Sequence, residues 1–98
     1  MPAYLIVNYD IVDPELYGEY AAGAGPAMKI GDECELVAMD TESTVLEGEN
    51  VGRQTIVLRV DSKDKAIELR DSRAYQAIIG KRLDATTNHF CVLVNGIG

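Results

Sequence analysis

Apolar residues occur in short runs along the chain, and stretches with helical spacing separate several of these runs. The runs are rich in Val, Ile, Leu and Tyr and are too short for core helices, which is typical of strands. In the clearest run, Ile56, Leu58 and Val60 fall on one face of an extended chain. The predicted strands are residues 3–9, 34–39, 54–60 and 88–94, with a further short strand at 44–46 that pairs back on the second.

The first helical stretch follows the first strand and has a clear starting signal. The tripeptide Asp-Pro-Glu at 13–15 supplies a capping side chain, a proline that loses no hydrogen bond, and an acid at the positive end of the dipole. Glycines and a proline at 23–26 disfavour an uninterrupted helix. The sequence therefore predicts a kink or break there, a resumed helix over 27–30, and a left-handed end at Gly31.

The second helical stretch follows the strand at 54–60. Ser62 is placed to cap a helix that begins at the next residue. Asp71 and Ser72 mark a break, after which Ser72 can cap a second helical piece that reaches Leu83. The resulting order, β-α-β-(short β)-β-α-β, is that of the ferredoxin-like split β-α-β. We therefore expect one α+β domain over residues 1–98, with an antiparallel sheet and both helical stretches on one face.

The predicted sheet carries apolar residues on both faces, including Ile6, Val57 and Leu93. Helices that pack on one face leave the other face open to solvent, which is unfavourable for a large apolar surface. A second copy of the chain is the simplest cover for that face. The pattern therefore predicts a homodimer.

Composition and charge narrow the range of partners. The 98 residues include 9 Lys+Arg and 16 Asp+Glu, and the formal net charge is −7. This balance disfavours binding to nucleic acid or to an anionic membrane surface, because both need a basic face. No apolar run approaches the length of a transmembrane helix. Because no positive charge precedes the first apolar run, we expect no signal peptide and a cytoplasmic location.

The two cysteines and the scarcity of histidine limit redox and metal chemistry. Cys34 and Cys91 form no CxxC unit, and a reducing compartment favours two free, buried thiols. An intrachain disulfide is the alternative, although the two residues belong to different predicted strands. One histidine and two separated cysteines match no zinc spacing, and the acids lack the order of a calcium loop. We expect no metal and no cofactor.

A histidine and two arginines are the candidates for charge-based chemistry. His89 can act as an acid or a base, and Cys91 lies on the same face of the predicted strand. Arg59 and Arg82 can each hold a carboxylate with two parallel hydrogen bonds. We assign catalysis to His89 and Arg59, and ligand binding to Arg82. The alternatives are a surface histidine, a buried thiol, an interface salt bridge for Arg59 and a surface cation for Arg82.

Tyrosines on the predicted helices are candidates for ligand binding. Tyr17, Tyr20 and Tyr75 can face the sheet, where their hydroxyls would orient a small organic molecule in a pocket between helix and sheet. Core packing with the hydroxyl at the rim is the alternative. Asn8 shares a strand face with Ile6 and would add an amide contact.

Several motifs occur together in a characteristic order. They are Met1-Pro2-Ala3-Tyr4, Asp13-Pro14-Glu15 with Tyr17 and Tyr20, Leu46-Glu47-Gly48, Ser62 with Ala66, Asp71-Ser72 before Tyr75-Gln76, Arg82, and Val92-Leu93-Val94-Asn95-Gly96. In these motifs the chain resembles the DUF1330 family of small bacterial proteins over nearly its whole length. The resemblance implies a ferredoxin-like fold in the dimeric α/β-barrel superfamily, in which two sheets pack face to face.

The resemblance implies an architecture more than a reaction. Analogy with the superfamily suggests cofactor-independent oxidation or isomerisation of a small organic acid, and a non-catalytic binding or structural dimer is the alternative. Haem binding by other members leaves His89 as an alternative haem ligand. The family often has an acid and a Phe where this chain has Arg59-Val60, and a Trp where it has Leu69. Such a charge reversal at Arg59 would favour a different ligand.

Overall fold

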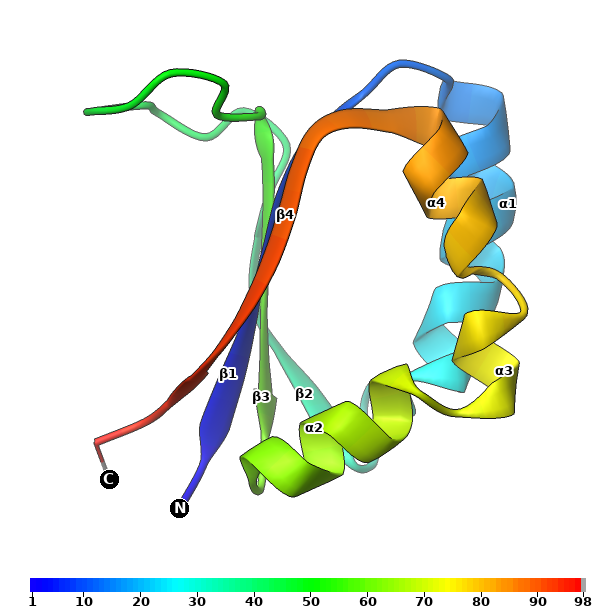
Figure 1. Ribbon diagram of the computed structural model, residues 1–98, viewed down its shortest axis with the longest axis vertical. Coiled ribbons are helices and arrows are strands. Elements are labelled where there is room, and N and C mark those ends of the chain that lie inside the picture. Colours follow the sequence, from blue (N-terminus) through cyan, green and yellow to red (C-terminus); the bar gives the residue numbers. More distant parts are fainter. Residues whose placement is uncertain (98) are drawn as a thin grey trace.

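A sheet and a layer of helices on one of its faces make up the computed structural model, which describes residues 1–97 (Figure 1). The strands stand side by side, and all the helices lie on the same side of them. In chain order the elements are β1 (Ala3–Ile11), α1 (Pro14–Ala27), β2 (Cys34–Asp40), β3 (Gln54–Val60), α2 (Lys63–Arg70), α3 (Arg73–Gln76), α4 (Ile79–Ala85) and β4 (Thr86–Asn95).

The sheet has the order β2-β3-β1-β4, and each strand is antiparallel to its neighbours. This order is that of the split β-α-β fold, in which β3 lies between β1 and β2, and β1 lies between β3 and β4. The predicted α+β, ferredoxin-like fold with an antiparallel sheet is confirmed.

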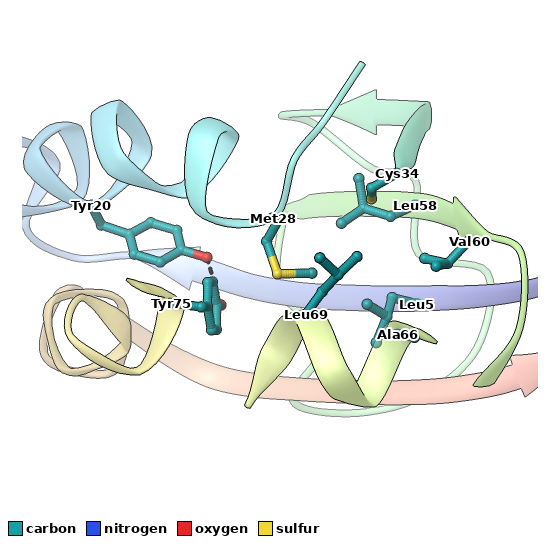
Figure 2. Packing of buried hydrophobic residues seen from close by; sticks show 9 residues of the cluster. All are labelled: Leu5, Tyr20, Met28, Cys34, Leu58, Val60, Ala66, Leu69 and Tyr75. Atoms are coloured by element: carbon teal, nitrogen blue, oxygen red, sulfur yellow. Dashed lines mark hydrogen bonds between the residues drawn. The ribbon is translucent and has the colours of Figure 1, made fainter. Parts of the chain in front are cut away.

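The buried core lies between the sheet and the helices. Leu5 is in register with Leu58 on β3 and with Leu93 on β4, so these side chains share the helix-covered face. Figure 2 shows Leu5 and Leu58 facing Ala66 and Leu69 of α2. The core cluster continues through Met28 and ends at the contact between Tyr20 of α1 and Tyr75 of α3.

The start of α1 agrees with the prediction, but its course does not. Asp13 accepts a hydrogen bond from the Leu16 N–H (3.1 Å). The predicted break at 23–26 and the resumed helix over 27–30 are wrong, because α1 runs on to Ala27 without interruption. Pro26 is the penultimate helical residue, so its missing N–H removes a bond only where the helix is ending anyway.

The helical region after β3 follows its capping signals. Ser62 accepts from the Lys65 N–H (3.1 Å) and Ser72 accepts from the Tyr75 N–H (3.2 Å), so both predicted starts are confirmed. The second piece is not continuous, however, because it ends after Gln76 and restarts as α4.

The loop between β2 and β3 replaces the strand predicted at 44–46. Within the described residues this segment forms no ladder, and Leu46 is 89% exposed. The chain turns at the end of β2, where the Asp40 carboxylate accepts from the Glu42 N–H (2.8 Å). The loop then leans away from the helices, to the side of the sheet that they leave open (Figure 1).

A bulge interrupts β4 opposite Tyr9. The register passes from Asn8↔Phe90 to Asp10↔Thr87, so β4 has one residue more than β1 at this point. Asn88 takes the left-handed conformation (φ 54°) that such a bulge requires, and asparagine tolerates that conformation better than most residues. The bulge allows β4 to start earlier than predicted, at Thr86.

The face of the sheet away from the helices has an apolar centre, and no helix of residues 1–97 covers it. Ile6 and Val57 are half-buried at its centre, and Phe90, Val92 and Val94 are exposed along β4. The predicted apolar character of both faces is therefore confirmed.

The remaining sequence predictions concern thiols and membranes. Both cysteines are free, with Cys34 buried and Cys91 half-buried, on the strands at opposite edges of the sheet. Among the described helices, none combines the length and apolar character that crossing a bilayer requires.

Candidate functional site

A cavity of about 210 Å³ lies between the helix-covered face of the sheet and the helices. Its wall takes residues from every strand and every helix of the described chain, and most of them are apolar. A neighbouring hollow of about 180 Å³ under α2 shares Leu5, Arg70 and Cys91 with it. Such a space can hold a small organic molecule if a few polar groups point into it.

Tyrosines from three elements supply polar groups at one end of the cavity. The Tyr9 and Tyr17 hydroxyl oxygens are 2.6 Å apart, and those of Tyr20 and Tyr75 are 2.7 Å apart. Ring centroids 5.6–6.2 Å apart connect Tyr9, Tyr17, Tyr20 and Tyr75 in that order. We call these four residues the tyrosine cluster. Figure 2 shows its Tyr20–Tyr75 contact beside Met28 at the edge of the apolar core.

Hydrogen bonds hold the hydroxyls of the tyrosine cluster in place, and burial keeps Tyr9 and Tyr20 protonated. Gln54, at the start of β3, donates from Nε2 to the Tyr17 hydroxyl (2.7 Å). Burial is the main cause that raises the pKa of Tyr9 and of Tyr20, and the hydrogen-bonded tyrosine partner raises each pKa further. At neutral pH these groups are therefore neutral hydrogen-bonding groups and not phenolate bases.

Arg82 brings a positive charge to the same end of the cavity. The residue is only 5% exposed, and its guanidinium carbon lies 5.8 Å from the centroid of the Tyr9 ring. Its Nε is buried without a hydrogen-bond partner, and no carboxylate within residues 1–97 forms an ion pair with it. The backbone of Arg82 is fixed in the last turns of α4, where its carbonyl oxygen accepts a hydrogen bond from the Thr86 hydroxyl (2.7 Å).

The other end of the cavity is apolar and reaches solvent beside β2. Met28, Ile56 and Leu58 line its interior. Leu36 and Met39 on β2 also line it, yet both are exposed. The helices leave this edge strand uncovered, so the cavity opens between β2 and the end of α1.

The structure brings together several of the residues that the sequence singled out. Tyr17, Tyr20, Tyr75 and Arg82 all line the cavity. Asn8 does not, because it lies on the opposite face and is 3% exposed. Its amide donates to the Gly52 carbonyl and the Thr55 hydroxyl (both 3.0 Å) and accepts from the Gly52 N–H (2.7 Å).

The residues assigned to catalysis lie apart from the cavity. Arg59 is in register with Tyr4 and Glu35 on the open face of the sheet. His89 is exposed beside the β4 bulge and is not part of the cavity wall, whereas Cys91 is. No group of three or more potential metal-ligating side chains occurs within residues 1–97.

Sequence reasoning missed several residues of the site. Tyr9 was assigned only to a strand, although its odd position places it on the same face as Leu5. Gln54 begins a strand whose other helix-facing positions are apolar. A single polar residue on an apolar strand face is a signal that could have indicated its role in the site. Arg70 lines the cavity from the last turn of α2, which only the tertiary packing determines.

These features define a class, a ferredoxin-like α+β domain with a cavity between its sheet and its helices. A protein of unknown function from Rhodopseudomonas palustris shares the fold with a TM-score of 0.79 at 14% identity, covering 99% of this chain and 83% of that one. A dimeric ferredoxin-like protein of unknown function from Thermobifida fusca gives 0.69 at 14%, covering 98% and 92%. A candidate antibiotic biosynthesis monooxygenase from Nitrosomonas europaea gives 0.57 at 11%, covering 97% and 90%.

The chain belongs to the DUF1330 family, a domain of unknown function whose pattern matches residues 2–97. The resemblance drawn from the sequence motifs is thereby confirmed. A comparison with curated proteins finds no significant match. At these identities the solved structures establish the fold alone.

Proposed function

We propose that the protein binds a small organic molecule in the cavity between its sheet and its helices. The observation that carries the proposal is the meeting of Arg82 with the tyrosine cluster in a space whose remaining wall is apolar apart from Arg70. An apolar wall with a few convergent polar groups is the usual form of a small-molecule site. A purely structural role would be better served by side chains that fill this space, because empty volume costs stability.

A saturable titration with a neutral one-ring probe tests this function. We expect benzyl alcohol to perturb the NMR signals of methyl groups at Met28, Ile56 and Leu58. Replacement of Ala24, which lines the cavity from α1, by phenylalanine should abolish these perturbations because the new ring occupies the space. Ala22→Phe is the matched control, because Ala22 is exposed on the same helix and is not part of the wall. Perturbations that do not saturate, or that persist in Ala24→Phe, would contradict the proposal.

The proposal includes a homodimer that pairs through the open face of the sheet. The exposed apolar residues on β4 support it, because surfaces of this kind usually bind a partner. The Thermobifida fusca neighbour is itself described as dimeric. In such a dimer the cavities lie on the outer, helix-covered sides of the two sheets, so each chain keeps its own site.

Turnover of the bound compound would extend this proposal to cofactor-independent oxidation or isomerisation. The fold shared with the candidate monooxygenase supports that reaction class. Once turnover is found, Arg82→Gln should reduce it, because Arg82 lines the cavity. Replacement of Arg59 or His89 should leave the kinetics unchanged, because neither residue is part of the wall. If replacement of Arg59 or His89 reduces turnover and Arg82→Gln does not, the reaction takes place outside the cavity.

A further inference from the structure

Arg82 is unusual among the cations of this chain. Within residues 1–97 it is the one lysine or arginine that is buried, and the others are exposed or half-buried. Its buried Nε has no partner, although the chain carries 16 Asp+Glu. None of the acids within residues 1–97 forms an ion pair with this guanidinium.

A buried guanidinium without a counter-charge is unfavourable and requires compensation. Arginine cannot relieve the cost by losing its proton, because its pKa is too high. The face of the Tyr9 ring offsets part of the cost through a cation–π contact. The ring offers no acceptor for the Nε hydrogen, so the site as it stands lacks a hydrogen-bond acceptor and a negative charge.

We propose that the cavity takes a small organic carboxylate, whose anionic group binds Arg82 and whose apolar body lies against Met28, Ile56 and Leu58. The inference rests on the ligand-binding function proposed above and adds the charge and the size of the ligand. A carboxylate matches a guanidinium with two parallel hydrogen bonds. The hydroxyls of the tyrosine cluster can donate to the same anion if their mutual hydrogen bonds rearrange.

The dimensions of the cavity limit the body of this carboxylate to about one ring. A dry cavity of about 150 Å³ in another protein admits benzene, so about 210 Å³ can admit a ring with one small substituent. A multiply charged ligand such as a phosphate ester fits poorly. Arg82 is the one buried cation of the described wall. Arg70, the other cation of the wall, is half-buried and lies 3.8 Å from an Asp71 carboxylate oxygen, so part of the ligand charge would stay unpaired in a largely apolar space.

Benzoate and benzyl alcohol form a matched pair of probes, because they share the ring and differ in charge. Calorimetric titration of the full chain should show benzoate binding more tightly than benzyl alcohol, by about tenfold or more. In Arg82→Gln this preference should disappear while benzyl alcohol still binds. Arg73→Gln is the control, because Arg73 is exposed on α3 and lies outside the wall, and it should retain the preference.

Alkylation of Cys91 provides a second readout, which needs no variant of Arg82. Cys91 lines the cavity and is half-buried, so benzoate should slow its reaction with iodoacetamide in the wild-type protein. Burial raises the pKa of the Cys34 thiol, which should therefore react slowly with or without benzoate.

The possible outcomes separate this inference from the proposed function. If both probes bind equally, the cavity binds small molecules but has no preference for a carboxylate. If Arg82→Gln keeps the preference for benzoate, Arg82 is not the group that binds the carboxylate. Either result overturns the inference. If neither probe binds and Cys91 is not protected, both the proposed function and this inference fail. If Arg82→Gln does not fold, the comparison of the two probes on the wild-type protein and the protection of Cys91 decide the matter.

Discussion

Buried polar residues position side chains of the cavity on one side of the sheet and fasten a loop on the other side. On the helix side, Gln54 and Thr86 hold Tyr17 and Arg82 in place at the cavity. On the open side, Asn8 satisfies its own amide by binding the backbone of Gly52, which fixes the end of the 41–53 loop on β1. A buried side-chain amide thus supports the site through Gln54 and the fold through Asn8.

Removal of the Asn8 amide should destabilise the protein. Asn8→Ala leaves the Gly52 N–H and C=O groups without their partner in a buried position, so we expect a loss of about 2 kcal/mol in the free energy of unfolding. Urea denaturation followed by circular dichroism measures this loss. Asn95→Ala, at an exposed position, should change the stability little. Equal effects of the two substitutions would show that Asn8 does not fasten the loop.

A side chain at Gly52 should be harmful for a steric reason. A Cβ atom there would lie 2.2 Å from the Tyr9 carbonyl carbon, which is backbone and cannot move aside cheaply. We expect Gly52→Ala to cost about 2–3 kcal/mol in denaturant unfolding. The control is Gly18→Ala in α1, where the added Cβ meets nothing within 4 Å. That substitution should stabilise the protein by about 0.5–1 kcal/mol, since alanine favours the helix. A Gly52→Ala protein as stable as the wild type would contradict the close approach.

At the scale of elements, capping residues predicted helix starts well, whereas ends and interruptions depended on tertiary packing. Asp13, Ser62 and Ser72 each cap a helix as their positions indicated. The glycines before Pro26 suggested a break, but Gly23 packs against Ile78, where a Cβ would lie 3.3 Å from the Cδ1 atom. That close approach between α1 and the residue before α4 requires a small residue, and a local sequence pattern does not reveal it.

An ion-pair cluster joins α2 to the turn between α1 and β2 and should make stability depend on pH. Glu33 bonds Lys65 (3.1 Å) and Lys29 (3.2 Å), and these side chains lower the pKa of Glu33. A carboxyl whose pKa is lower in the folded protein stabilises it above the unfolded pKa, and this contribution is lost as the pH falls through the folded pKa.

Glu33→Gln should therefore reduce the loss of stability on acidification. Between neutral pH and about pH 3, the wild-type unfolding free energy should fall further than that of the variant. The control is Glu47→Gln in the exposed loop, which should follow the wild-type profile. If the Glu33→Gln and wild-type profiles run parallel, the cluster does not contribute.

At the scale of the whole molecule, element order determined the architecture, and packing determined the site. The order of elements was enough to predict the antiparallel sheet, and alternation along the strands was enough to predict its two apolar faces. It was not enough to assign Arg59 and Asn8 to the face away from the cavity, because that requires knowing which face the helices cover. Tyr9 and Arg70 reach the cavity from elements whose local sequence gives no sign of a pocket.

A charge on the open face should weaken the proposed homodimer. Val92→Asp introduces an acid at a position that is 45% exposed on β4, and in a symmetric dimer the two acids would be desolvated together. Sedimentation velocity should therefore show a dimer for the wild type and a monomer for the variant. Leu83→Asp, at a position 42% exposed on α4, is the matched control and should remain dimeric. A monomeric wild type would show that there is no such dimer. Dissociation by Leu83→Asp but not by Val92→Asp would show that the dimer contact lies on the helix side.

A crystal structure of the wild-type protein grown with saturating benzoate tests the central claim most directly. The claim is that the cavity between the helices and the sheet binds a small organic carboxylate through Arg82. We predict electron density for the ring between α1 and β3, with the carboxylate within hydrogen-bond distance of the Arg82 guanidinium. A cavity without benzoate, or benzoate bound with its carboxylate away from Arg82, would contradict the account.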